Sequence, residues 1–203
     1  MSPRDEVIWV GPSRCDEARA FREEQLKNIW QILVSSEEIV NMHLVVGVGL
    51  DLFREALSCY QNGAFMASIL MCGVALETLL YDLVSAVKGR AVCDRGFIQS
   101  IEPDYNIYEK DFSLIISEAK GKRLLDNKLE NKVNKLRNLR NIVAHYAQRR
   151  WKQMLNQLRP DVELITSISG GGWASEKDAY EVLKDAANII RDLIKRAYMI
   201  LCR

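Results

Sequence analysis

The stretch AFMASILMCGVALETLLYDLVSAV, residues 64–87, is apolar on nearly every side of a helical wheel. A helix of this composition is stable in water only when other helices cover it on all sides. Glu77 and Asp82 interrupt the run and make it too polar for a comfortable membrane span. We therefore expect a central, buried helix over residues 64–87, in a protein that does not cross a membrane.

The pattern on both sides of this stretch is helical as well, and no convincing alternation of strand residues occurs. We expect further helices over about residues 16–34, 38–60, 112–119 and 124–158, and a last helix over about residues 175–200. Ser175 and Asp178 have the spacing of a capping box at the start of that last helix. Residues 90–110 lack periodicity and contain Gly96 and Pro103, so we expect an irregular connection there.

Length and composition are those of one globular domain. The chain has 203 residues, of which 48% are hydrophobic and 27% charged, and folding a chain of this length buries about 70% of its unfolded surface. The sequence predicts an all-α protein, an antiparallel up-and-down bundle of five to six helices. It forms a single domain, 1–203, with an N-terminal helix in 1–36 and the core in 37–203.

The charge of the chain is unevenly distributed. The formal net charge is only +1, but residues 120–160 hold twelve Lys and Arg against two acidic residues, a formal charge of +10. The rest of the chain sums to −9. A basic segment on an acidic body favours an anionic partner.

The cysteines indicate a reducing compartment. The five are scattered along the chain without a Cys-x-x-Cys pair: Cys15, Cys59, Cys72, Cys93 and Cys202. Several lie in apolar helical runs, where cysteine packs as a small hydrophobic residue. The N-terminal MSPRDEVIWV does not have the basic-then-apolar layout of a signal peptide. We expect a cytoplasmic protein. The scattered cysteines and the two distant histidines give no metal-ligand set, so we expect neither metal nor cofactor.

The long basic helix carries a cation in its apolar stripe. At about 100° per residue, five residues form the stripe that faces the bundle: Leu129, Val133, Leu136, Val143 and Ala147. Arg140 occupies the slot between Leu136 and Val143. A buried guanidinium is costly unless an anion or acceptor meets it. Either a partner such as Glu77 lies opposite Arg140, or the slot opens onto a cleft.

Next to Arg140, the same helix carries an amide and an imidazole. Asn141 and His145, four residues apart, share a face, whereas Arg140 and His145 lie about 140° apart on either side of Ala144. The helix thus combines a permanent cation, an amide and a group that titrates near neutrality. These are the parts needed for proton transfer beside a phosphate.

These residues resemble a known family. Leu139-Arg140-Asn141-Ile142-Val143-Ala144-His145 is similar to the Arg-x4–6-His motif of HEPN domains, in its Arg-Asn-x-x-x-His form. The preceding stretch, residues 64–80, resembles the helix that comes before this motif, and Gly73 and Glu77 match its Gly-x-x-x-Glu signature. The likeness covers roughly residues 40–200. We therefore take everything after the N-terminal helix, 37–203, as the HEPN-like core.

The resemblance implies a function and a role for each matching residue. Many HEPN domains are dimeric, metal-independent endoribonucleases in which two motif helices face one another across a cleft. His145 would accept the proton of the RNA 2′-hydroxyl or protonate the leaving oxygen. Arg140 would stabilise charge on the phosphate, Asn141 would orient it, and Glu77 would position Arg140. The product would carry a 2′,3′-cyclic phosphate, and DNA would be inert.

The resemblance also implies RNA and a second copy of the chain as partners. Four residues of the basic segment would hold the RNA backbone: Arg137, Arg149, Arg150 and Lys152. An apolar arc of Leu139, Ile142 and Tyr146 favours a homodimer, and Trp151 could contact RNA or the second copy. Some family toxins carry a tyrosine two residues after the histidine, which a nucleotidyltransferase modifies. Here Tyr146 follows His145 directly, so an antitoxin or nucleotidyltransferase partner stays open.

Three hypotheses follow from the sequence. The first is a dimeric HEPN ribonuclease, a toxin or defence effector that cuts RNA. The second is a non-catalytic HEPN module that binds RNA, a nucleotide or a protein partner. The third is a structural helical protein in which Glu77 and Arg140 form a buried ion pair.

Overall fold

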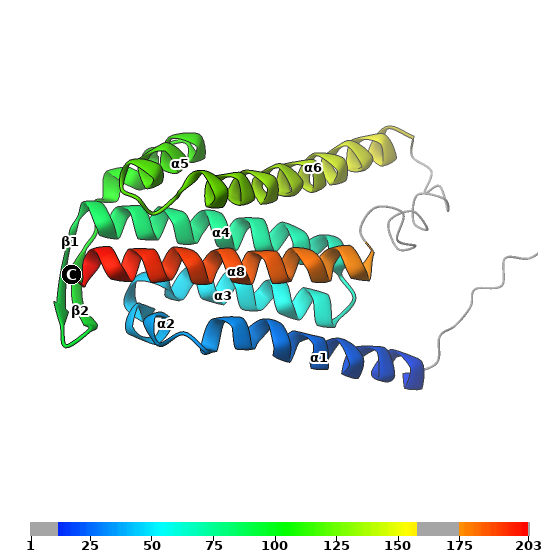
Figure 1. Ribbon diagram of the computed structural model, residues 1–203. Helices are drawn as coiled ribbons and strands as arrows, with labels where there is room; N and C mark the ends of the chain where they lie inside the picture. The colour runs from blue at the N-terminus through cyan, green and yellow to red at the C-terminus, as the bar shows by residue number, and fades with distance from the viewer. Residues whose placement is uncertain (1–11, 158–174, 203) are drawn as a thin grey trace, which may run out of the picture.

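The computed structural model describes residues 12–157 and 175–202, with side chains for 16–145 and 175–202. This part of the chain is almost entirely helical, as the sequence predicts (Figure 1). Its α-helices are α1 (Pro12–Val34), α2 (Glu37–Asn41), α3 (His43–Gln61), α4 (Phe65–Lys88), α5 (Phe112–Gly121), α6 (Asn127–Gln157) and α8 (Glu176–Leu201).

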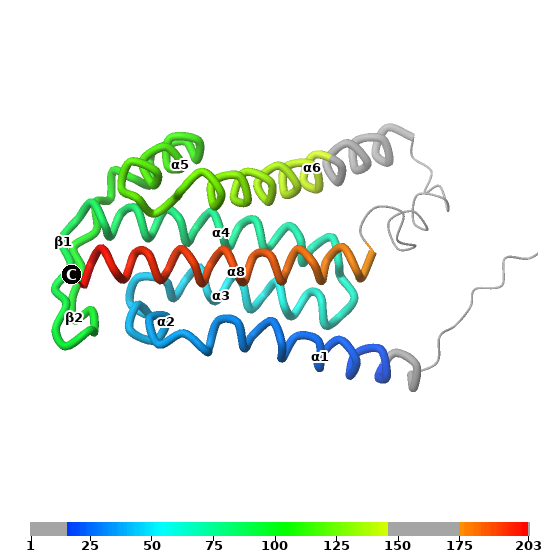
Figure 2. The backbone as a smooth tube through the Cα atoms, in the orientation of Figure 1, coloured from blue at the N-terminus to red at the C-terminus, as the bar shows by residue number. Residues whose placement is uncertain are grey.

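The long helices form an up-and-down bundle around α4. Successive long helices run in opposite directions, and α4 lies between α6 on one side and α3 and α8 on the other (Figure 2). The apolar residues of α4 are buried on several of its faces, among them Cys72, Leu76, Leu80 and Val84. The prediction of a central helix over residues 64–87 is therefore confirmed.

The described helices include one that could cross a membrane by length and apolar composition alone, α4. More than half of its apolar window is buried inside the bundle. This burial is typical of the core helix of a soluble protein.

The helix expected over residues 38–60 is divided in two. Met42 separates α2 from α3, with φ −99° and ψ 6°, and its side chain is completely buried. The apolar pattern runs on through the break because Met42 itself is a core residue. Periodicity alone therefore shows no interruption at this position.

The expectation of an irregular connection over residues 90–110 is wrong. Two antiparallel strands, β1 (Arg90–Asp94) and β2 (Phe97–Glu102), form a hairpin at one end of the bundle (Figure 1). A 3-10 helix, η1 (Tyr105–Glu109), follows it. The two turn residues of the hairpin, Arg95 and Gly96, have φ of 48° and 85°, the backbone of a tight hairpin turn. Alternation is masked because the pairing shifts register between Val92 and Cys93.

Two of the scattered cysteines are paired with each other, which the interpretation of the cysteines as typical of a reducing compartment does not predict. Cys93 of β1 and Cys202 after α8 form a disulfide that joins positions 109 residues apart. No local spacing in the sequence indicates that Cys93 and Cys202 are paired, because only folding brings the hairpin to the end of α8. Cys72 is buried in the core, as expected, and Cys59 is partly buried, while the side chain of Cys15 lies outside the described residues. The compartment of the protein stays a prediction.

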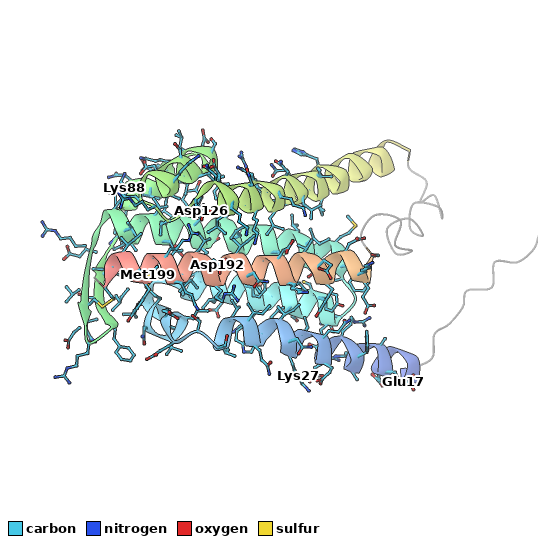
Figure 3. All side chains as sticks on the ribbon, in the orientation of Figure 1. Glu17, Lys27, Lys88, Asp126, Asp192 and Met199 are labelled. Atoms are coloured by element: carbon cyan, nitrogen blue, oxygen red, sulfur yellow. A yellow bond between two sulfur atoms is a disulfide. The ribbon has the colours of Figure 1, made fainter. Side chains whose placement is uncertain are left out.

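The starts of α6 and α8 are fixed by local hydrogen bonds. Asp126 accepts a hydrogen bond from the Leu129 amide at 2.8 Å and pairs with Arg196 of α8 at 2.5 Å, and it lies where α6 begins (Figure 3). In α8, the Ser175 hydroxyl accepts from the Asp178 amide, and the Asp178 carboxylate accepts from the Ser175 amide. The predicted capping box is confirmed.

Candidate functional site

The apolar stripe of α6 faces the core as predicted. Leu129, Val133, Leu136 and Val143 are all buried against the other helices. The side chain of Ala147, the last predicted member, lies outside the described residues. This orientation directs Arg140, in the same stripe, towards α4.

Arg140 meets Glu77 across the gap between α6 and α4. The guanidinium Nη2 donates a hydrogen bond to Glu77 Oε2 and forms an ion pair with it. The two side chains are only 25% and 27% exposed. Of the two alternatives for Arg140, a carboxylate partner is therefore the one found. Arg140 Nε is buried without a hydrogen-bond partner, so the guanidinium keeps one donor that Glu77 does not satisfy.

Gly73 creates the space through which Arg140 reaches Glu77. A Cβ atom at position 73 would lie 2.5 Å from Arg140 Cβ and 2.6 Å from Arg140 Cγ, which is closer than such atoms can approach. Gly73 and Glu77 are four residues apart and share one face of α4. The glycine admits the aliphatic stem of Arg140, and one turn later the glutamate receives its guanidinium.

Asn141 and His145 form no hydrogen bond with Arg140 within one chain. Asn141 is partly buried, whereas His145 is exposed on the side of α6 that faces away from the core. Neither side chain forms a hydrogen bond with another described residue. The single chain thus brings together Glu77, Gly73 and Arg140, and leaves the imidazole of His145 apart from them.

The predicted RNA-binding cations are only partly described. The guanidinium of Arg137 lies over the ring of Phe112, the first residue of α5, 5.7 Å from its centroid. The side chains of Arg149, Arg150, Lys152, Tyr146 and Trp151 lie outside the described residues, although α6 remains helical to Gln157. No pattern in the sequence predicts the contact between Arg137 and Phe112, because it depends on how α5 folds back onto α6.

The structure adds a groove that sequence reasoning missed. It has a volume of about 820 Å³ and lies between α6 and α8. Its floor is apolar and includes Ile69, Leu136 and Val182, and its α8 rim carries the carboxylates of Asp178, Glu181 and Asp185. Leu139 and Ile142 line the α6 side, and Ile142 is 50% exposed. The groove is on the flank of α6 opposite Arg137, since Arg137 and Leu139 lie about 160° apart around the helix.

The described residues contain no group of three or more His, Cys, Asp or Glu side chains placed to hold a metal ion. The metal-free chemistry implied by the resemblance stays a prediction.

The chain matches no protein-family model, and neither a curated protein nor a solved structure matches it significantly. The likeness to HEPN domains therefore depends on the residues of α4 and α6 alone.

Proposed function

We propose that this protein is a metal-independent endoribonuclease of the HEPN type that acts as a homodimer. The observation that carries the proposal is the position of Arg140 in the apolar stripe of α6. Gly73 leaves room for its side chain, and Glu77 orients its guanidinium. This arrangement fixes the guanidinium in one place and orientation. Arg140 lies one residue from Asn141 and five from His145, on the helix that carries the basic segment.

The proposed reaction is an internal attack within the RNA. The 2′-oxygen bonds to the neighbouring phosphorus while the bond from phosphorus to the 5′-oxygen breaks, leaving a 2′,3′-cyclic phosphate and a 5′-hydroxyl. One imidazole takes the proton of the 2′-hydroxyl, and a protonated imidazole gives a proton to the leaving oxygen. Arg140 stabilises the charge that develops on the phosphate, and Asn141 orients it.

The proton transfers favour a site shared by two copies. The reaction needs a base and an acid, but α6 supplies one histidine, His145, which is exposed. Two copies related by a two-fold axis supply both imidazoles. The half-exposed Ile142 and the α6–α8 groove provide an apolar surface for a second α6, and the α8 carboxylates can face its lysines.

Uncompensated charge on α6 supports an anionic substrate. Lys120 pairs with Glu130, and Arg140 pairs with Glu77. In contrast, Lys128, Lys132 and Lys135 form no ion pair with any described residue. Free cations of this kind bind phosphates and release counterions, so RNA binding should weaken steeply with salt. A cytoplasmic toxin or defence effector is the role that this activity fits, although disulfides such as Cys93–Cys202 are rare in cytosolic proteins.

The deciding experiment is cleavage of a mixed RNA pool in excess chelator. We expect the wild type to cut RNA but not DNA and to leave 2′,3′-cyclic phosphate ends. His145→Ala and Arg140→Ala should lower the rate by at least about a hundredfold. His43→Ala is the matched control, because His43 is the other exposed histidine and lies at the start of α3. Cutting by His145→Ala at the wild-type rate would show that the mechanism is wrong.

A second candidate function is a non-catalytic HEPN module that binds RNA, a nucleotide or a protein partner. The ion pair favours it, because a phosphate must compete with Glu77 for Arg140. Under this hypothesis the folded wild type binds RNA in a salt-dependent manner and does not cleave it.

A further inference from the structure

A row of aromatic side chains leads away from Arg137, on the flank of α6 opposite the groove. The guanidinium of Arg137 lies over Phe112, whose centroid is 5.9 Å from that of Tyr81. Tyr81 stacks on Tyr108 at 6.0 Å with an interplanar angle of 13°, and Tyr108 lies 6.4 Å from Tyr105. We call Phe112, Tyr81, Tyr108 and Tyr105 the aromatic row. Its residues come from α5, α4 and η1, and α5 lies beside the first part of α6 (Figure 1).

The row is held in place although its far end is open to solvent. Tyr105 is 73% exposed and Tyr108 is 47% exposed. The Tyr81 hydroxyl donates to the Lys110 carbonyl oxygen at 2.5 Å, and the Tyr108 hydroxyl donates to Asp82 Oδ1 at 2.7 Å. Of the two exposed rings, Tyr108 is fixed in this way, and a fixed ring loses little conformational entropy when a ligand stacks on it. Within the described part of the chain, Tyr105 is held only by its ring contact with Tyr108.

Charges around the row favour a planar, uncharged group at the rings. Glu118 is paired with Lys88 and Lys110, so these two lysines are already engaged. The cation that remains beside the row is Arg137 at its inner end. Exposed Glu109, next to Tyr108, repels phosphates from the outer part, whereas exposed Asp111 is next to Phe112 at the inner end. A strand bound here would therefore place its bases on the rings and its backbone towards α6.

We propose that the aromatic row is a nucleobase-stacking subsite for single-stranded RNA, with Tyr105 and Tyr108 as the rings that contact bases. Aromatic platforms beside a cationic track are how proteins bind single strands without reading their sequence. The row begins at Arg137, one turn from Arg140, so it extends the candidate site along the substrate. This inference deepens the proposed function and rests on it in taking RNA as the ligand, but it does not require that the RNA is cleaved.

The test compares Tyr105→Ala with two matched controls. Tyr105→Phe keeps the ring, and Phe97→Ala removes a ring on β2 that is 49% exposed but outside the row. All three are made in a His145→Ala background, so that binding is measured without cleavage. The readout is the fluorescence anisotropy of a short, unstructured, labelled RNA.

We expect Tyr105→Ala to raise Kd about tenfold, with Tyr105→Phe and Phe97→Ala within about twofold of their parent. The dependence of Kd on salt should stay the same, because a ring neutralises no phosphate. An unchanged Kd in Tyr105→Ala would overturn the proposal. So would Tyr105-dependent binding of a basic peptide by a protein that does not bind RNA.

Cleavage assays with His145 present separate this inference from the proposed function. If the wild type cleaves RNA and Tyr105→Ala has an unchanged KM and Kd, the stacking subsite is wrong and the ribonuclease stands. If the wild type binds RNA through Tyr105 but never cleaves it, the subsite stands and the ribonuclease is wrong.

Discussion

Gly73 is the residue that allows α6 to approach α4 closely enough for the candidate site to form. Substitution by alanine places a Cβ atom 2.5 Å from Arg140 Cβ, an atom next to the backbone that cannot swing aside. The two helices must then separate. We expect Gly73→Ala to lower the free energy of unfolding by about 1–3 kcal/mol, measured by urea unfolding.

Gly47→Ala is the matched control for this prediction. Gly47 also lies inside a helix, α3, but a Cβ atom there has no neighbour closer than His43 Cε1 at 3.9 Å. Alanine is the better helix former, so this variant should gain about 0.5–1 kcal/mol. Equal stability of the two variants would contradict the close approach at Gly73.

The Arg140–Glu77 ion pair has a structural role whichever functional hypothesis holds. Arg140→Ala and Glu77→Ala each leave a partly buried charge without its partner. We expect each to cost about 1.5–3 kcal/mol, below the cost of breaking a fully buried pair because about a quarter of each side chain remains in water. The double variant should cost clearly less than the sum of the single ones, as denaturant unfolding can measure. Strict additivity would show that the two side chains do not interact.

At the scale of secondary structure, the sequence predicts helices far better than it predicts what joins them. The helices α4 and α6 follow from long apolar patterns, and the position of Arg140 in the apolar stripe predicts a partner such as Glu77. The hairpin was missed because its strands are short and shifted in register, although its Arg95-Gly96 turn was a usable signal. The groove and the aromatic row depend on distances between elements, and no local pattern in the sequence contains these distances.

The α6–α8 groove gives a prediction for assembly. Ile142 is half exposed at its edge, so Ile142→Asp places a carboxylate in the proposed contact with a second copy. We expect this variant to stay folded, to sediment as a monomer and to lose RNA cleavage.

Lys177→Asp, which also introduces a carboxylate but at an exposed position of α8 outside the groove, should remain dimeric and active. A wild-type chain that is monomeric at micromolar concentration, or an active monomeric Ile142→Asp, would contradict the shared site.

At the scale of the whole molecule, the Cys93–Cys202 disulfide closes a covalent ring that contains β2, α5, α6 and α8. The candidate site uses residues of this ring, such as Arg140, against Glu77 of α4, which precedes it. A cross-link between distant positions acts mainly by restricting the unfolded chain, and one that closes so long a loop contributes about 2–5 kcal/mol, towards the upper end in the chain-entropy model. We expect a reductant to lower the free energy of unfolding of the wild type by this amount.

The control for the disulfide is the double variant Cys93→Ser/Cys202→Ser, which should have the stability of the reduced wild type and be indifferent to reductant. Cys72 should not react in the folded state, because burial raises the pKa of its thiol and keeps it protonated. If the reductant lowers the stability of the double variant as much as that of the wild type, the effect does not come from this bond. If the wild type is equally stable with and without reductant, packing of the hairpin on α8 is sufficient. The close approach of the Gly96 turn to Tyr198 of α8, where a Cβ atom at position 96 would lie 2.8 Å from Tyr198 Oη, would then be part of this packing.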